Sequence, residues 1–378
     1  MGNKNIITIN DIDFTFNPGD TILEAARQNN IDIPGLCHLK RTNPTGRCNI
    51  CVVEIKDVSD LVNSCMTEAK DGMKVYTESQ KVVEARKNTI KSMLYSGNHN
   101  CAIRDFDADD WTKFQLKVME DDKTNDLCPA WGNCELQNLA YKYQVTIKNQ
   151  PMPECKYETE RVNPFIIRDF SRCILCGRCV KACREIQVNN AIDFGYQNED
   201  LKIIAGEDVA LKDSDCVFCG ECVQACPVGA LVTEKTITRQ RFTPVKKTRT
   251  TCSYCGVGCQ MDIFTQDNKI IEITGADNDP APNHASLCVK GRFGFDFVSS
   301  SERLTTPLLR KDGELKEATW DEAIEAVASN LSAIKDEYGP DSIGVLTSAR
   351  ITNEENYIAQ KFTRAVLKTN NIDHCARL

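Results

Sequence analysis

The residues best suited to chemistry in this sequence are its cysteines, and the densest group lies between Cys173 and Cys226. Two runs there, SRCILCGRCVKACRE and SDCVFCGECVQACPVGA, share the spacing CxxCxxCxxxC. This spacing is typical of iron–sulfur ligation in which the fourth cysteine of each run binds the other cluster. The predicted [4Fe–4S] ligand sets are therefore Cys173, Cys176, Cys179 and Cys226 for one cluster, and Cys216, Cys219, Cys222 and Cys183 for the other.

Zinc is the alternative for these runs, but structural zinc sites usually join two separated ligand pairs rather than a compact triplet plus one. Gly177 and Gly220 permit the tight backbone approach that a cluster needs. The segment resembles the two-cluster ferredoxins of bacteria, so electrons are expected to pass through it. The 32 residues Arg184–Asp215 between the runs are expected to form a packing extension.

Composition sets limits on partners and compartment. The 378 residues include 46 basic and 54 acidic ones, a net charge of −8, and no basic block, which argues against a nucleic-acid partner. The 21 cysteines cluster in ligand spacings, so a reducing, cytoplasmic setting fits better than a disulfide scaffold. No signal core and no run of 18 apolar residues is present, and we expect neither an export signal nor membrane insertion.

The N-terminal segment predicts a small sheet around a cysteine loop. Ile6–Ile9 and Asp13–Phe16 alternate as a hairpin, a short helix follows over Thr21–Asn30, and Val52–Ile55 reads as a strand. A loop rich in Pro and Gly between them carries most of a four-cysteine set: Cys37, Cys48, Cys51 and, after thirteen residues, Cys65.

The spacing of this set is not that of plant ferredoxins. The PGLC loop and the GxCxxCxVE pattern resemble the N-terminal domain shared by iron-only hydrogenases, the large peripheral subunit of respiratory complex I and NAD-linked formate dehydrogenases. The resemblance implies a β-grasp fold with one [2Fe–2S] cluster on Cys37, Cys48, Cys51 and Cys65. A structural zinc loop is the alternative.

A predicted helix, Glu78–Tyr95, leads into GNHNC and later CPAWGNCELQ. In the same family these positions bind a [4Fe–4S] cluster through one histidine and three cysteines, which implies the ligands His99, Cys101, Cys128 and Cys134. This sequence departs from the family, because 26 residues separate Cys101 from Cys128 where two are usual; the inserted stretch could be a surface helix that docks a partner. A surface histidine is the alternative for His99, and Cys155 fits no ligand spacing.

The last third contains Cys252, Cys255 and Cys259 as CxxCxxxC, completed by Cys288 in SLCVKGRFG. This pattern resembles the N-terminal cluster domain of molybdenum- or tungsten-bis(pterin) oxidoreductases, formate dehydrogenases above all. The resemblance implies a [4Fe–4S] cluster on these four cysteines and places Lys290 between cluster and pterin. A solvated surface lysine is the alternative for Lys290.

Beyond Pro307 the sequence predicts the start of an alternating α/β domain. Capping boxes open two helices, one at Thr319 with Glu322 and one at Thr352 with Glu355, around a strand at Ile343–Leu346. The next strand should begin within NNIDHCARL, so we expect the domain to be incomplete.

The segment TNEENY followed by NxDHCAR resembles formate dehydrogenases, in which a metal-ligating Cys or selenocysteine comes next. We hypothesise that Leu378 precedes a selenocysteine codon read as a stop, with Cys375 near the site but not a ligand. DNA with a stop other than UGA after this codon would refute the hypothesis.

The expected fold class is α+β and multidomain. The predicted domains are a [2Fe–2S] ferredoxin-type domain (1–78), a [4Fe–4S] domain with one histidine and three cysteine ligands (79–150), a double [4Fe–4S] ferredoxin-type domain (151–244), a molybdopterin oxidoreductase 4Fe–4S domain (245–304) and the incomplete start of a molybdopterin-binding α/β domain (305–378).

The resemblance implies the electron-transfer part of a formate dehydrogenase catalytic subunit, with one [2Fe–2S] and four [4Fe–4S] clusters. Molybdenum or tungsten bis(pterin guanine dinucleotide) and formate or CO2 would belong to the full-length protein, and this chain by itself is not expected to oxidise formate. The implied partner is a diaphorase subunit that binds flavin and NAD, with ferredoxin or hydrogenase subunits as further candidates.

Three rival functions remain at this point. An iron-only hydrogenase shares the pattern through Pro227 but would lack the CxxCxxxC…CVKG element. A relay subunit like that of complex I would carry electrons without catalysis, and a scaffold protein would hold zinc instead of iron.

Overall fold

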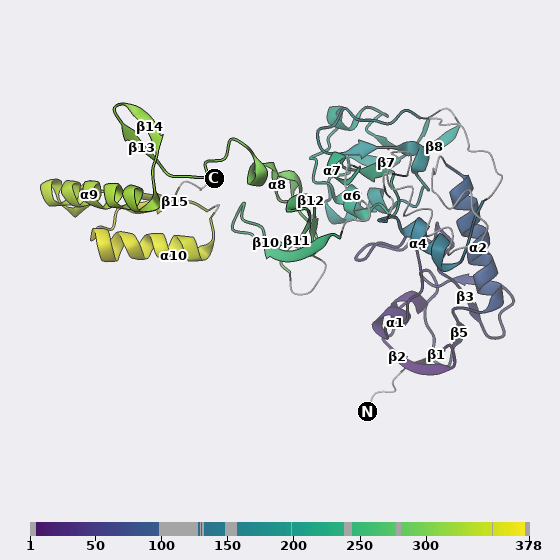
Figure 1. Ribbon diagram of the computed structural model, residues 1–378. Helices are drawn as coiled ribbons and strands as arrows, with labels where there is room; N and C mark the ends of the chain where they lie inside the picture. The colour runs from purple at the N-terminus through teal and green to yellow at the C-terminus, as the bar shows by residue number, and fades with distance from the viewer. Residues whose placement is uncertain are drawn as a thin grey trace. The chain divides into compact units, whose positions relative to one another are not determined.

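The computed structural model describes residues 5–97, 128, 130, 132–147, 157–197, 199–237, 244–276, 281–349 and 351–374. The chain divides into two compact units, Met1–Lys246 and Lys247–Leu378, and each is considered by itself (Figure 1). No helix in the described ranges is long and apolar enough to span a membrane.

The N-terminal part of the first unit is a mixed five-stranded sheet in the order β2-β1-β5-β3-β4. Only the β1–β5 pair is parallel; the other three pairs are antiparallel. Its strands and one helix are β1 (Asn5–Ile9), β2 (Ile12–Phe16), α1 (Ile22–Gln28), β3 (Val52–Ile55), β4 (Val62–Asn63) and β5 (Lys74–Tyr76).

The predicted hairpin, helix and strand of this part are all confirmed. Asn10 and Asp11 both have positive φ, 49° and 66°, the conformation that a tight hairpin turn requires. Thr21 caps α1 through a capping box with Glu24. The helix covers the sheet with fully buried side chains, among them Ile22 and Leu23, so this end of the unit has its own apolar core.

A buried arginine joins the next two helices to the cysteine loop. The helices are α2 (Gln80–Tyr95) and α4 (Glu135–Lys142). Arg86 of α2 is fully buried and donates to the carbonyl oxygens of Ile50 (2.9 Å) and Val52 (2.8 Å) and to the Tyr143 hydroxyl (2.8 Å). The loop that carries Cys48 and Cys51 is thereby fixed to the helices. Sequence reasoning did not single out Arg86.

The two CxxCxxCxxxC runs fold into short elements of the first unit. These are β6 (Ile167–Arg168), α5 (Arg178–Lys181) with a π-helical turn Ala182–Ile186, β7 (Ile192–Gln197), β8 (Asp200–Ala205), α6 (Glu221–Ala225), β9 (Leu231–Val232) and α7 (Glu234–Ile237). The expected packing extension between the runs is the antiparallel β7–β8 hairpin. Phe194 of this hairpin lies against Gly177, where an added Cβ would be 3.0 Å from the ring.

The second unit begins with a three-stranded sheet in the order β10-β11-β12, followed by a hairpin and a β-α-β element. Its elements are β10 (Lys246–Thr251), β11 (Gln260–Gln266), β12 (Lys269–Gly275), α8 (Val289–Phe293), β13 (Leu308–Lys311), β14 (Glu314–Glu317), α9 (Trp320–Tyr338), β15 (Val345–Thr347), α10 (Asn353–Phe362) and β16 (Ile372–His374).

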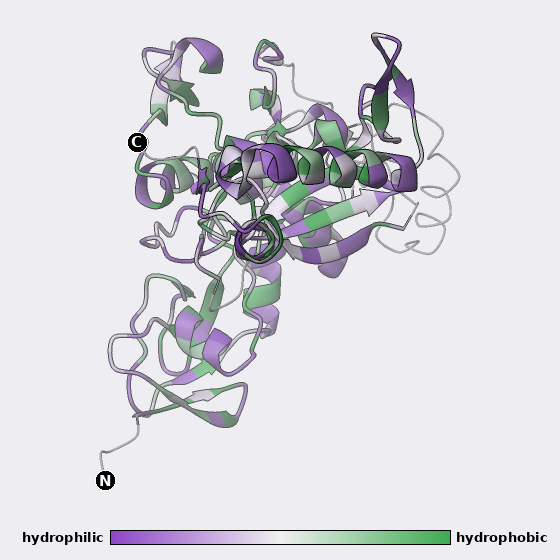
Figure 2. Ribbon diagram, turned by 90° about the vertical axis from the view of Figure 1, so that its left-hand side faces the viewer, coloured by the Kyte–Doolittle hydropathy of each residue, from purple (hydrophilic) through white to green (hydrophobic). Residues whose placement is uncertain are grey.

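Both predicted capping boxes of this unit are present, on α9 and α10. The expected strand lies one to two residues later than predicted, as β15, and the strand expected within the last residues is β16, paired parallel to β15. The helices carry both hydrophobic and hydrophilic residues along their length (Figure 2).

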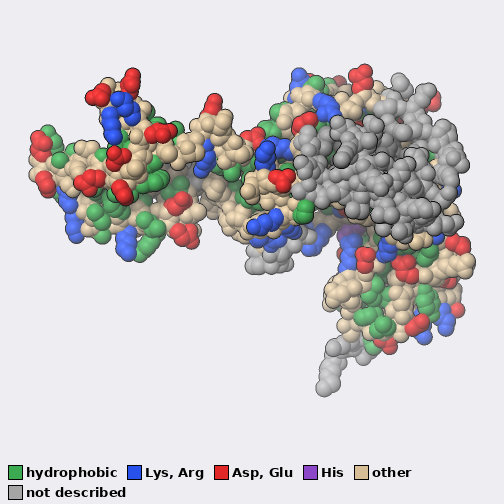
Figure 3. All heavy atoms as spheres, in the orientation of Figure 1, with side chains coloured by type: hydrophobic (Ala, Val, Ile, Leu, Met, Phe, Trp, Pro, Cys, Tyr) green, Lys and Arg blue, Asp and Glu red, His purple; other side chains and the backbone are tan. Residues whose placement is uncertain are grey.

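The apolar stripe of α9 is on the surface of its unit. Trp320, Ile324 and Val327 are 71%, 60% and 57% exposed, and they line a groove with Phe362 and Val366 from the helix that follows β15. Hydrophobic side chains are visible on this surface over α9 and α10, at the left of Figure 3.

Candidate metal centres

The turns at the start of the two cysteine runs of the first unit share their left-handed residues. Leu175 and Phe218, at equivalent places between two cysteines, both have φ of 53°, and Gly177 and Gly220 have φ of 78° and 72°. A left-handed conformation costs about 1–2 kcal/mol for a residue with a Cβ, so the surrounding structure must hold Leu175 and Phe218 in place. Successive amides in such turns form a concavity for anionic groups, as at many iron–sulfur sites.

The strained turns aim backbone amides at sulfur. The Leu175 amide lies 3.4 Å from the Cys173 sulfur, and the Phe218 amide lies 3.4 Å from the Cys216 sulfur. Such donors stabilise a thiolate and its added charge when the cluster is reduced. The repeated geometry therefore suits two equivalent clusters.

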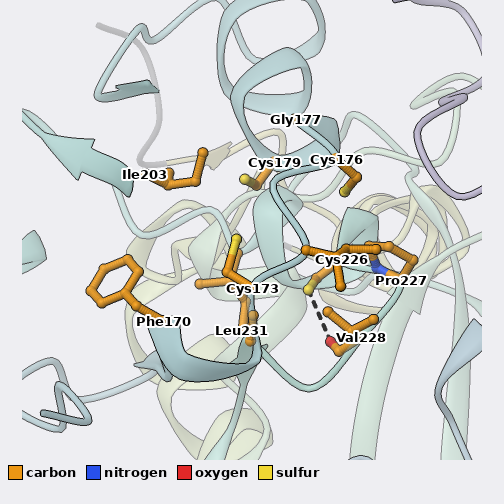
Figure 4. Close-up of a pocket in the computed structure, with 12 residues that line it drawn as sticks. Phe170, Cys173, Cys176, Gly177, Cys179, Ile203, Cys226, Pro227, Val228 and Leu231 are labelled. Atoms are coloured by element: carbon orange, nitrogen blue, oxygen red, sulfur yellow. Dashed lines mark hydrogen bonds between the residues drawn. The ribbon is translucent and has the colours of Figure 1, made fainter. Parts of the chain in front are cut away.

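The structure brings Cys226, the last cysteine of the second run, to the triplet of the first run. Cys173, Cys176, Cys179 and Cys226 line one cavity, closed on its other sides by apolar groups such as Phe170 and Ile203. In Figure 4 the four sulfur atoms lie around this space. The four cysteines that the spacing predicts as ligands of one cluster therefore lie around one cavity.

Burial sets the protonation of these thiols. It raises the pKa of Cys173 to about 11 and that of Cys176 to about 12, and raises the pKa of Cys179 as well. Without metal they are neutral thiols. Because iron binds the thiolate, cluster binding must release their protons.

The second group assembles in the same way. Burial raises the pKa of Cys222, and the nearby thiols of Cys219, Cys216 and Cys183 raise it further. The Ala191 amide donates to the Cys183 sulfur at 3.2 Å. Cys183, from the first run, is thus placed with the triplet of the second.

The thiols of the N-terminal set are in mutual contact and almost fully buried. Cys37 is hydrogen-bonded to Cys48 and to Cys65, which lowers its pKa. The hydrogen bond from Cys65 lowers the pKa of Cys51 to about 6. An added Cβ at Gly46, which has φ of 62°, would be 2.9 Å from Met66, so the loop before Cys48 requires glycine there.

Only half of the predicted set of one histidine and three cysteines can be placed, because His99, Cys101 and also the unassigned Cys155 lie outside the described residues. Cys128 and Cys134 are both buried in a core that also contains Cys176. The Cys128 sulfur accepts from Arg172 at 3.2 Å, and this arginine is paired with Asp169 at 2.7 Å. A guanidinium beside a sulfur suits a metal-bound thiolate.

The cysteine set of the second unit consists of Cys252, Cys255, Cys259 and Cys288. Burial chiefly raises the pKa of Cys259, and the thiols of the other three cysteines raise it further. Cys252 is buried, whereas Cys255 and Cys288 are exposed. Cys288 precedes α8, and an added Cβ at Gly291 of this helix would be 3.5 Å from the Cys252 sulfur. Lys290, in the first turn of α8, is exposed.

The buried amine of Lys181 in the first unit bears on whether negatively charged iron–sulfur clusters suit the neighbouring cysteines. The Lys181 side chain ends in a buried Nζ with no hydrogen-bond partner in the described structure, and the thiols of Cys37, Cys65 and Cys176 act on it electrostatically. Net negative clusters on these cysteines would add to the negative charge that Glu185 places near this amine. In the described ranges no three His, Cys, Asp or Glu side chains close around one metal ion, whereas a cluster spreads its ligands over several irons.

Family models match four segments of the chain. A 2Fe-2S iron-sulfur cluster binding domain matches residues 4–80, a 4Fe-4S dicluster domain 172–230, a molybdopterin oxidoreductase Fe4S4 domain 245–300 and a molybdopterin oxidoreductase domain 303–378. The chain therefore contains iron–sulfur domains of both cluster types and a molybdopterin-family segment, which confirms those predictions.

Two curated Bacillus subtilis (strain 168) proteins are similar over nearly the whole chain. "Probable oxidoreductase YjgC" is 31% identical over 100% of the chain, and "Putative formate dehydrogenase YrhE" is 35% identical over 95%. A Staphylococcus aureus (strain MW2) protein named "Putative formate dehydrogenase MW2229" is 33% identical over 98%. The chain spans only 38–40% of the length of these relatives.

Among solved structures, the chain resembles a chain from the crystal structure of an NAD+-reducing [NiFe]-hydrogenase in the H2-reduced state. The TM-score is 0.52 and the identity 26%, over 64% of this chain and 90% of that one.

Proposed function

We propose that this chain is the electron-transfer portion of a cytoplasmic formate dehydrogenase, with formate and CO2 interconverted at a molybdopterin site for which this chain supplies only the first part. The observation that carries the proposal is the order of its sites: a [2Fe–2S] domain, a dicluster [4Fe–4S] domain and a molybdopterin oxidoreductase Fe4S4 domain follow one another in one chain. Relatives named formate dehydrogenases support this choice of substrate.

The proposed ligands are the cysteine sets described above. The N-terminal set would hold the [2Fe–2S] cluster. The two sets formed by the CxxCxxCxxxC runs, called the interchanged sets because each run gives its fourth cysteine to the other, would hold one [4Fe–4S] cluster each. The set in the second unit would hold one more [4Fe–4S] cluster. A further [4Fe–4S] cluster is proposed for His99, Cys101, Cys128 and Cys134. Iron–sulfur clusters, when bound, supply one-electron transfer.

The chain's own residues hold and insulate these sites. Phe170, Ile203 and Val228 close the cavity of the first set against water. Amides such as those of Leu175 and Phe218 are fixed toward sulfur before any electron arrives, so little reorganisation is needed on reduction. The protein in this way sets the order, potential and separation of the sites, and the redox chemistry belongs to the cofactors.

Lys290 is proposed to lie between the cluster of the second unit and a pterin. Its ammonium would favour the reduced, more negative cluster electrostatically. Lys290 is two residues after Cys288, in the first turn of α8. The proposed catalytic cofactor is molybdenum or tungsten held by bis(pterin guanine dinucleotide).

Electrons would leave toward a diaphorase subunit that binds flavin and NAD. The likeness to a chain from an NAD+-reducing hydrogenase supports such a partner. The same observation favours a second candidate, a relay subunit that carries electrons for a hydrogenase or another NAD-linked enzyme without oxidising formate itself.

Anaerobic purification followed by iron and sulfide analysis tests the proposal. We expect about 18 iron atoms per chain, from one [2Fe–2S] and four [4Fe–4S] clusters, and reduction of these clusters by formate once the molybdopterin part and its cofactor are present. Full iron content without reduction by formate would favour the relay function, and zinc in place of iron would refute both.

A further inference from the structure

Lys181 lies where two of the proposed cluster sites adjoin. The residue is 6% exposed and belongs to α5, in the first cysteine run. The groups that act on it electrostatically come from both sites: Cys37 and Cys65 of the N-terminal set, Cys176 of the first interchanged set, and the carboxylate of Glu185. Its buried Nζ has no hydrogen-bond partner in the described structure. An isolated buried charge is costly, so its place requires a compensating negative group.

The two sites are held together by specific contacts around Lys181. The Asn43 amide, in the loop between Cys37 and Cys48, donates to Glu185 at 2.9 Å. Arg47 of the same loop stacks over the Phe194 ring, with 4.2 Å from its guanidinium carbon to the ring centre. These contacts dock the N-terminal cysteine loop on the residues that follow Lys181 in the chain.

The second cysteine run provides an internal comparison. The two runs align as CVKAC and CVQAC, so that Gln224 occupies the position of Lys181. Both runs have the same turn geometry and the same amide contacts to sulfur. At this aligned position a positive charge is therefore present only in the run that faces the N-terminal set, and cluster ligation itself does not require it.

We propose that Lys181 is a positioning residue for electron transfer, which stabilises an added electron on both the [2Fe–2S] cluster of the N-terminal set and the adjacent [4Fe–4S] cluster. This inference rests on the proposed function. Each reduction adds one electron to a cluster and moves no proton. Because the charge acts on both sites, it raises both potentials together and changes the difference between them little.

The test is a redox titration of the anaerobically purified chain with its clusters, followed by electron paramagnetic resonance, in which the two cluster types have distinct signals. Lys181→Met and Lys181→Gln remove the charge, and the latter copies the second run. We expect the reduced-to-oxidised ratio of both clusters at a fixed potential to fall about tenfold, equivalent to ~59 mV for one electron.

Two control variants distinguish the effect of the Lys181 charge on the cluster potentials from other effects of the substitution. Lys181→Arg should stay within about twofold of the wild type, because it keeps the charge. Lys87→Met, on the exposed side of α2, removes a lysine from the same unit and should change neither ratio.

The outcomes distinguish this inference from the proposed function. Unchanged potentials in both neutral variants, or a change at one cluster only, refute the role of Lys181 while the clusters themselves stand. Loss of either cluster from both neutral variants, with retention in Lys181→Arg, assigns the lysine to cluster retention and also refutes the tuning role. A wild-type protein without iron–sulfur signals refutes the proposed function itself.

Discussion

The two units of the molecule differ in how far they bury their cysteines and their apolar side chains. In the first unit the N-terminal cysteines and Cys176 of the first run are buried within the same cores as its aliphatic side chains. In the second unit Cys255 and Cys288 are exposed, and so is the apolar stripe of α9. The first unit thus insulates its sites with its own chain, whereas the second presents both a cysteine set and an apolar face at its surface.

Replacing one proposed ligand in each unit should give the largest effects. Both replacements should lower the iron content, but only one should also lower the melting temperature of its unit. Cys176→Ser and Cys288→Ser should each remove about four iron atoms per chain, because each takes away one of four cluster ligands. Only Cys176 belongs to a buried core, so only its replacement should also lower the melting temperature of the first unit. Iron analysis and calorimetry measure both effects.

Val217→Ala is the control for these variants, since this exposed residue follows Cys216 and should keep full iron content. Equal loss of first-unit stability in both serine variants would contradict the contrast between the units.

Truncating one isoleucine in each unit sharpens the comparison of the apolar faces. Ile9→Ala, at a fully buried position of β1, should cost about 2–4 kcal/mol of unfolding free energy. Ile324→Ala, at 60% exposure on α9, should cost less than about 1 kcal/mol. Urea unfolding followed separately for each unit measures this. A cost at Ile324 as large as at Ile9 would show that another surface covers α9 in solution.

Thiol alkylation of iron-free protein tests the difference in access. Cys255 and Cys288 should react with iodoacetamide at least about tenfold faster than Cys176 and Cys179, because buried thiols react only after local opening. Mass spectrometry of the labelled peptides measures the rates. Uniform labelling would mean that the cores around the first set open as readily as the surface.

The smallest expected effect concerns acid stability of the second unit. Asp262 of β11 is paired with Arg249 (2.5 and 3.1 Å) and Lys247 (2.9 Å), and the hydrogen bonds from Arg249 chiefly lower the pKa of Asp262. Its contribution, about 1 kcal/mol, should be complete above the ordinary pKa of about 3.9. It should be lost as pH falls through the lower folded value.

Asp262→Asn should therefore destabilise the second unit at neutral pH, and the difference from wild type should vanish in acid. Asp267→Asn, in the exposed turn after β11, is the matched control and should change little. A difference between wild type and Asp262→Asn that persists in strong acid, well below the ordinary carboxyl pKa, would contradict the ion-pair account.

Local patterns predicted much of the fold. The hairpin around Asn10 and Asp11 follows from alternation and from a turn that both residues accommodate. The helices after Thr21, Thr319 and Thr352 follow from capping boxes that close over three residues. Each of these signals acts within one turn or one strand pair, so no knowledge of the rest of the chain is needed.

The candidate sites were predictable where their ligands follow one another closely. Three cysteines two residues apart indicate a cluster loop from the sequence alone, and the exchange of Cys183 and Cys226 follows from the same spacing. The contrast between CVKAC and CVQAC was also visible in the sequence. The sequence did not show what this contrast means, because no local pattern indicates that the first run faces the N-terminal cysteines.

The sequence by itself determined which turns close and where helices begin, because those choices are made by neighbours within a few positions, and the cysteine spacing predicted the ligand sets in the same local way. Only the tertiary structure decided that β1 pairs with β5, that Arg86 fixes the Cys48 loop, and that Lys181 lies buried between two cysteine sets. Burial and electrostatic fields arise from segments that are far apart in the chain and meet only when it folds.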